Sequence, residues 1–268
     1  MFLSPAEKVY SYSAGFKLIG FTPILVVGLI AVAVVAPDWQ KLLQPGWFTG
    51  LLASAALSIF WWRNLSRELI SVHNEGIARS SLFGAKEIRW DQVKETRYSQ
   101  TTTAQSVGMH FGLIGILIGS IAARKAGASK ATQLLKIISQ DGTKISLNNY
   151  LQNHRELMKT ALSRVNPRLL NDFRARVKQG IPVEFGKLQL SLEGVRWGNK
   201  GPLPYQQIET ADVRGQNFCI KATGKWMNFL SVGASKVPNL FVAVDLIEEF
   251  KSGAAKSQLE QLSFAAAI

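Results

Sequence analysis

The sequence predicts a membrane-anchored α+β protein, in which an N-terminal helical hairpin precedes two β-rich modules that each end in a helix. Three observations support this prediction. Two long uncharged runs occupy much of the first 62 residues. The chain behind them alternates apolar and polar residues, which is the period of a half-buried strand. The tripeptides at 75–77 (Glu-Gly-Ile) and 193–195 (Glu-Gly-Val) match, which indicates an internal repeat.

The uncharged runs, at 18–36 and 47–62, form the predicted transmembrane hairpin of residues 1–66. At about 1.5 Å per residue, the first run nearly spans a hydrocarbon core of about 30 Å. The second run is shorter but begins and ends with tryptophan, which prefers the headgroup level. We therefore expect the interface anchors to be Trp47, Trp61 and Trp62. A pair of buried core helices is the alternative interpretation.

Lysine and arginine set the predicted orientation of this hairpin. Lys8 and Lys17 precede the first run, Arg63 and Arg67 follow the second, and the loop between them carries Lys41. The positive-inside rule then places both termini of a multi-pass cell-membrane protein in the cytoplasm. A cleavable signal peptide is the alternative for the first run, and it leaves the rest of the chain on the same side.

A third apolar run, at 107–123, interrupts the first β module. Its residues Gly115 and Gly119 form a small-xxx-small pair, which lets helices approach closely in lipid. We favour an interfacial or re-entrant insertion, because a full span would separate the strands on either side of it. A third transmembrane span and a buried soluble hairpin are the alternatives. Three basic residues follow the run and suit an anionic surface: Arg124, Lys125 and Lys130.

The two β modules cover residues 67–178 and 181–252, and a C-terminal tail follows at 253–268. In the first module, Asp141-Gly142 lies between two runs of strand-forming residues, a strong hairpin signal. The helix that ends this module begins near Leu151, because apolar residues recur there three and four positions apart. The second module repeats the order of strands, hairpin and helix.

The stretch NEGIARSSLFGAKEIRWDQV, at 74–93, resembles the opening of bacterial membrane-anchored pleckstrin-homology-like (PH-like) domain proteins. In that family a helical hairpin precedes the pattern E-G-I…(R/K)…I-x-W-x-x-I. Residues 185–247 are similar to a related family of uncharacterised PH-like membrane proteins. The resemblance covers roughly residues 65–250 and implies two antiparallel β-sandwich or barrel modules, each capped by a C-terminal helix, without enzymatic activity. The first hairpin loop lacks the dense Lys/Arg cluster of phosphoinositide-binding members.

Basic residues are concentrated in the middle of the chain, since the segment 63–180 carries most of the formal net charge of +13. Near an anionic leaflet each Lys or Arg contributes at most about 1 kcal/mol. We therefore expect the helix region after residue 150 to contact anionic headgroups, whereas an ordinary solvated helix face is the alternative. The residues concerned are Arg155, Lys159, Arg164, Arg168, Arg174, Arg176 and Lys178.

Several other side chains have two interpretations. Trp226 and Phe229 lie beside Lys225 and either insert at an interface or pack in the core of the second module. Trp90 and Trp197 are expected to be core residues. The single cysteine, Cys219, is expected there too, since a free cysteine usually buries as a small apolar side chain.

The sequence indicates a protein that is not an enzyme. It has no cluster with metal-ligand spacing and no phosphate-binding loop, and the resemblance brings no cofactor. The expected function is an integral membrane protein whose modules bind anionic membrane lipids, a protein partner by strand addition, or a second copy of the chain, and not nucleic acid. The alternative is an oligomeric channel or transport component with the 107–123 segment embedded in the membrane.

Overall fold

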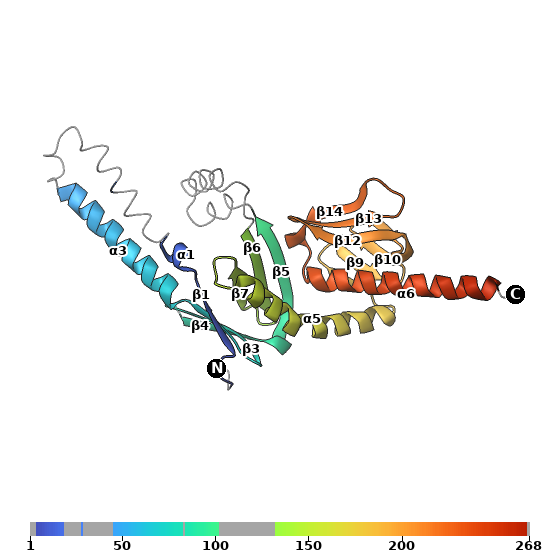
Figure 1. Ribbon diagram of the computed structural model, residues 1–268, viewed down its shortest axis with the longest axis horizontal. Coiled ribbons are helices and arrows are strands. Elements are labelled where there is room, and N and C mark those ends of the chain that lie inside the picture. Colours follow the sequence, from blue (N-terminus) through green and yellow to red (C-terminus); the bar gives the residue numbers. More distant parts are fainter. Residues whose placement is uncertain (1–3, 19–27, 29–44, 83, 102–131, 267–268) are drawn as a thin grey trace. The chain divides into compact units, whose positions relative to one another are not determined.

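The computed structural model describes residues 4–18, 28, 45–82, 84–101 and 132–266 of the chain. These residues form four small antiparallel sheets and a few helices (Figure 1). Two of the sheets have four strands and two have three. Four strands, a short 3-10 helix, three strands and a long helix follow one another twice along the chain, so the described part has a repeated architecture. Within the described residues, the first copy has two additional helices after its first strand, and the second copy has an additional 3-10 helix before its last helix.

The chain divides into two compact units, and compact unit 1 holds residues 1–89 and 150–157. Its sheet has the order β1-β2-β3-β4, and its buried face carries Ile70, Val72, Ile77 and Ile88. Cross-strand pairing puts these side chains on one face, because Val72 is opposite Ile77 and Ile77 is opposite Ile88. The elements of this unit are β1 (Lys8–Ser11), α1 (Ala14–Leu18), α3 (Pro45–Arg67), β2 (Leu69–Val72), β3 (Gly76–Ser81) and β4 (Gly84–Arg89).

Compact unit 2 holds residues 90–149 and 158–268, and it begins with the three-stranded sheet β5-β6-β7. The β6–β7 hairpin turns at Asp141-Gly142, as the sequence predicts. Helix α5 buries Met158, Ala161 and Val165, which confirms the predicted apolar face. The helix continues through Pro167. The elements are η3 (Trp90–Gln92), β5 (Val93–Thr101), β6 (Thr132–Ser139), β7 (Lys144–Asn148) and α5 (His154–Lys178), of which residues 154–157 belong to compact unit 1.

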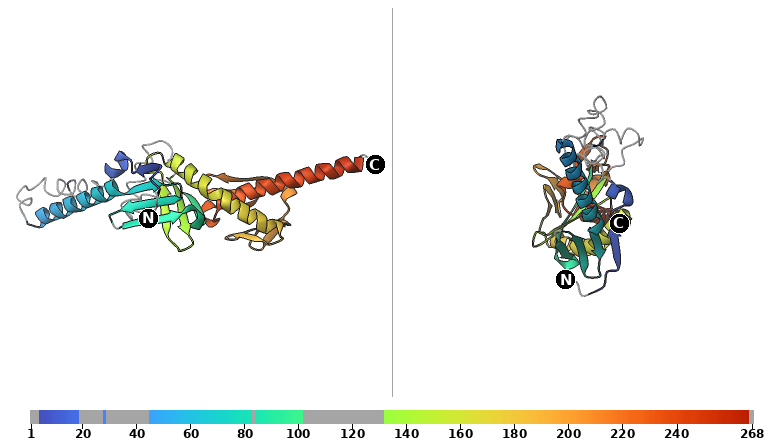
Figure 2. Two further views of the ribbon diagram at one scale, coloured as in Figure 1. Left: turned by 90° about the horizontal axis from the view of Figure 1, so that it is seen from below. Right: turned by 90° about the vertical axis from the view of Figure 1, so that its left-hand side faces the viewer.

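The second repeat lies entirely in compact unit 2. Helix α6 runs alongside its strands (Figure 2) and buries Leu240, Leu246 and Ile247. The repeated Glu-Gly-Val element needs its glycine, since Gly194 has φ +134° and a Cβ there would lie 2.2 Å from the carbonyl oxygen of Leu203. The elements are β8 (Val183–Phe185), β9 (Leu188–Ser191), β10 (Gly194–Trp197), β11 (Lys200–Leu203), η4 (Tyr205–Gln207), β12 (Ile208–Arg214), β13 (Asn217–Ala222), β14 (Asn228–Gly233), η5 (Ala234–Lys236) and α6 (Leu240–Ala266).

One asparagine ties strand β5 to the start of helix α6 within compact unit 2. The backbone N–H of Thr96 donates to Asn239 Oδ1 at 2.7 Å, and the N–H of Asn239 donates to the Thr96 carbonyl at 2.7 Å. Asn239 Nδ2 also donates to the carbonyl of Lys94 at 3.4 Å. Because β5 is the edge of its sheet, these bonds satisfy edge groups that no strand pairs.

The predicted membrane-anchored α+β fold is wrong. The second predicted span, 47–62, lies in helix α3, and among the described residues no helix is long and apolar enough to cross a membrane. The uncharged stretch of α3 contains Thr49, Gly50, Ser54 and Ser58, and the helix becomes charged at Arg63. Short length and polar content together keep it below the requirement for a span.

The corrections extend to the other membrane predictions. The first predicted span, 18–36, lies outside the described residues apart from positions 18 and 28. The transmembrane hairpin of residues 1–66, the multi-pass location and the cytoplasmic placement of both termini all depended on two spans, and the helices of the described residues do not support them.

Candidate functional site

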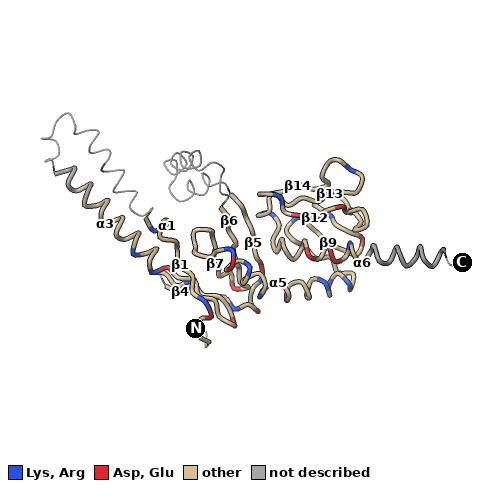
Figure 3. The backbone as a smooth tube through the Cα atoms, viewed as in Figure 1, with Lys and Arg blue, Asp and Glu red and all other residues tan. Residues whose placement is uncertain are grey.

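The basic residues predicted on the helix after residue 150 all lie on α5 (Figure 3). Most of them are exposed. Arg168 and Arg174 bond to other elements of the fold. The guanidinium of Arg168 donates to the carbonyl of Val93, and Arg174 Nε pairs with Glu249 at 2.7 Å. Within the described part of the chain, no ion-pair partner approaches Lys159, Arg176 or Lys178, and Arg155 and Arg164 are also exposed. The helix therefore has exposed basic side chains, and its contact with anionic headgroups stays a prediction.

The other predicted site residues divide between α3 and the undescribed stretch. Trp61 and Trp62 are half-buried on α3, a helix that does not qualify as a membrane span, and the side chain of Trp47 lies outside the description. The proposed helix-packing pair and the basic residues after it also lie outside the described residues, as does the whole 107–123 segment on which the channel alternative depends. These are Gly115, Gly119, Arg124, Lys125 and Lys130.

The hairpin between β13 and β14 presents an apolar tip. Trp226 is 90% exposed and Met227 is 61% exposed, so Trp226 does not pack in the core. The turn is closed by the N–H of Lys225, which donates to the carbonyl of Ala222 at 3.2 Å. Phe229 is half-buried at the start of β14. An indole at this level of exposure contributes little to folding and is available for contact with another molecule.

Strand β14 is the edge of the sheet β12-β13-β14. The N–H of Ala234 donates to the carbonyl of Gln216 at 2.9 Å. The backbone N–H and C=O groups of the even-numbered residues of β14 therefore point toward β13. Successive backbone groups point to opposite sides of a strand, and the N–H and C=O groups of Ser231 and Gly233 therefore point away from the sheet. No described residue bonds to these outward groups. The exposed tip thus adjoins an open edge.

The core predictions for Trp90 and Cys219 are confirmed, whereas Trp197, at the end of β10, is half-buried. Trp90 is buried in η3, and Cys219 is buried on β13 with its Sγ 3.6 Å from Ser231 Oγ. Tyr205, at the position in the second repeat that matches Trp90, donates its hydroxyl to the carbonyl of Ser191 at 2.9 Å. Burial raises the pKa of Tyr205 above its ordinary value, which suits a neutral structural donor.

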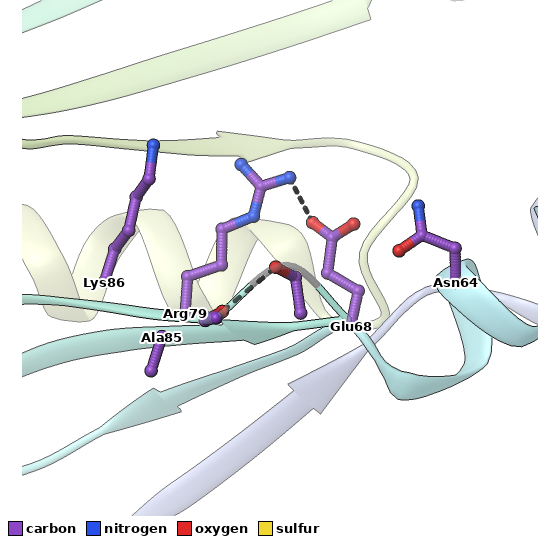
Figure 4. A pocket seen from close by; sticks show the side chains of 7 residues that line it. Asn64, Glu68, Arg79, Ala85 and Lys86 are labelled. Carbon is purple, nitrogen blue, oxygen red and sulfur yellow. Dashed lines mark hydrogen bonds and ion pairs between the residues drawn. The ribbon is translucent and has the colours of Figure 1, made fainter.

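A separate polar cavity of about 310 Å³ lies in compact unit 1, between the C-terminal turn of α3 and the β3–β4 hairpin (Figure 4). Its buried carboxylate, Glu68, forms an ion pair with Arg79 and accepts a hydrogen bond from Tyr12 Oη at 3.1 Å. Sequence reasoning missed this site, because its residues come from a helix and two strands. The lining residues are Asn64, Glu68, Arg79, Ser81, Gly84, Ala85 and Lys86.

In the described ranges, no three His, Cys, Asp or Glu side chains gather closely enough to hold a metal ion.

Comparison with known protein families gives one result that covers most of the chain. A family model described as a family of unknown function (DUF6585) matches residues 10–256. Searches of curated proteins and of solved structures give no match.

Proposed function

The chain belongs to the DUF6585 family, and since the function of that family is unknown, we propose one from the geometry: the protein is a non-catalytic module that binds an extended segment of another protein along strand β14. The observation that carries this proposal is the 90% exposure of Trp226 next to an unpaired strand edge. Exposed tryptophans are the residues most enriched at the energetic centres of protein interfaces.

Strand addition suits this edge for a specific reason. An incoming strand would form main-chain hydrogen bonds with Ser231 and Gly233, whose N–H and C=O groups face outward. These bonds supply affinity without selecting a sequence. The side chains of Trp226 and Met227 at the hairpin tip would then contact apolar residues of the partner and supply selectivity.

Local charge favours a partner that carries acidic residues. Most of the formal net charge of +13 belongs to the segment 63–180, so the charge that counts at β14 is that of the nearby lysine. A partner segment that combines apolar residues with Asp or Glu can pair with such a lysine. Lys225 is exposed beside Trp226, where it can form an ion pair with an acidic residue of the partner segment.

Selection of random peptides on the full chain tests the proposal. We expect selected peptides to be rich in Asp, Glu and apolar residues and to compete with one another. Trp226→Ala should weaken their binding at least tenfold. Ser231→Pro removes an outward N–H that β13 does not use, so it should weaken binding as well while leaving the fold intact.

The matched control for Trp226→Ala is Leu192→Ala, which truncates another exposed apolar side chain, on the β9–β10 turn. It should leave peptide affinity unchanged. Peptide binding that survives both Trp226→Ala and Ser231→Pro contradicts the proposal. Failure to select any peptide, together with Trp226-dependent binding to phosphatidylserine vesicles, would show that the tip serves a lipid surface instead.

A further inference from the structure

We propose that the cavity in compact unit 1 is a binding site for a small phosphomonoester, a ligand that carries both negative charge and a hydrogen-bond donor. This site is independent of strand β14, which belongs to compact unit 2. The cavity of about 310 Å³ exceeds a phosphate ion and falls at the lower end of the size of small-molecule pockets.

The strand register places two cations side by side in this cavity. Arg79 on β3 is directly opposite Lys86 on β4. They share the face of the sheet that carries Ile77 and Ile88, because each lies two residues away from one of them. Figure 4 shows the two side chains extending in the same direction into the cavity. Like charges directly opposite each other destabilise a sheet unless an anion lies between them.

The protein neutralises one of these charges and not the other. Glu68, with a side-chain exposure of 6%, pairs with Arg79. Lys86 is exposed and has no acidic partner among the residues that the structure describes. One positive charge per cavity is therefore available to a ligand oxyanion, and the guanidinium of Arg79 can share that anion from the neighbouring strand.

The opposite wall of the cavity offers acceptors. Asn64 Oδ1 is buried and has no hydrogen-bond partner, and Glu68 presents a carboxylate beside it. A buried acceptor without a donor is costly, and a ligand hydroxyl or P–OH group would satisfy it. The cavity has cationic side chains at one end and hydrogen-bond acceptors at the other. It therefore favours an anion that also carries a hydrogen-bond donor. A phosphomonoester whose organic part carries a hydroxyl, such as glycerol 3-phosphate, meets both demands, and sulfate meets only the first.

Calorimetric titration of the full chain at constant ionic strength tests this proposal, with inorganic phosphate and sulfate as matched probes. Phosphate carries a P–OH donor and sulfate carries none, so phosphate should bind about tenfold more tightly. Lys86→Gln should weaken phosphate binding about tenfold, and Lys86→Arg should restore it, since the loss of one charged hydrogen bond has about that effect.

The control is Lys144→Gln, which removes the same charge from an exposed, unpaired position on β7. It should leave phosphate affinity within about twofold of the wild-type value. Equal affinity for the two anions, equal losses in the two lysine variants, or no phosphate binding would overturn the proposal. Titration with glycerol 3-phosphate and with phosphatidic acid vesicles then distinguishes a free phosphomonoester from a lipid headgroup.

Discussion

Replacing Asn239 with alanine should lower the free energy of unfolding by about 3 kcal/mol. Asn239 is 5% exposed, and its Oδ1 accepts the backbone N–H of Thr96, which is itself buried. Truncation leaves that N–H without a partner, at about 2 kcal/mol. Asn239 also has φ +49°, a conformation that costs alanine about 1 kcal/mol more than asparagine or glycine.

Urea unfolding of the wild-type chain and of Asn239→Ala measures this loss, and hydrogen exchange of the Thr96 amide reports on the bond itself. Asn239→Gly is the control, since it loses the same hydrogen bonds and avoids the alanine strain, and its loss should be about 1 kcal/mol smaller. An alanine variant within about 1 kcal/mol of wild type, or a Thr96 amide that exchanges at the wild-type rate, would refute the assignment of this asparagine as the tie between β5 and α6.

Three further outcomes follow from single side chains. Gly194→Ala should destabilise the chain by about 3 kcal/mol in urea unfolding, because φ +134° and the Leu203 carbonyl both exclude a Cβ, and a loss below about 1 kcal/mol would contradict this. Burial raises the pKa of Tyr205, so its contribution to stability is complete below the unfolded-state value of about 10 and is lost as the pH rises above it. Tyr205→Phe should therefore reduce the alkaline loss of stability in urea unfolding, and an unchanged pH profile would count against it. Trp226→Ala should change the free energy of unfolding by less than about 0.5 kcal/mol, since its side chain is 90% exposed, and a larger loss would mean that the tip packs in the fold.

Local patterns predicted the elements that local chemistry determines. Asp141-Gly142 has the residues that a tight hairpin needs, and the turn forms there. The spacing of Met158, Ala161 and Val165 produces one apolar face, and that face is buried. In these cases the residues that give the signal are the same residues that form the structure, so no knowledge of distant partners is required.

The membrane prediction shows where such reasoning stops. An uncharged run between tryptophans is typical of a lipid-facing helix and also of a helix that packs on protein. In α3, Ser54 and Ser58 are among the most buried side chains, which indicates close packing through small polar residues. A count of charges weights these serines no differently from leucine. The total hydropathy of the helix, with its Thr49 and Gly50, decides against a span.

The cavity in compact unit 1 could not be found from spacing, since it depends on strand register. Arg79 and Lys86 are seven residues apart, and they meet because the β3–β4 turn sets them opposite each other. A shift of β4 by one residue would put Lys86 on the opposite face from Arg79. Glu68 and Asn64 join them from the end of α3, and the sequence contains no signal for that meeting.

Comparison of the two repeats separates what the fold requires from what it does not. Each three-stranded sheet ends in a hairpin, β6–β7 in the first repeat and β13–β14 in the second. The first hairpin turns through polar residues, where Asp141 Oδ1 accepts the N–H of Thr143 at 2.8 Å and that bond holds the pKa of the carboxyl below its usual range. The second hairpin exposes Trp226 and Met227 at the corresponding place. The polar turn of the first repeat shows that a hairpin at this position forms without an aromatic tip. The exposed indole of the second repeat adds little to stability, so we explain it by a contact with another molecule.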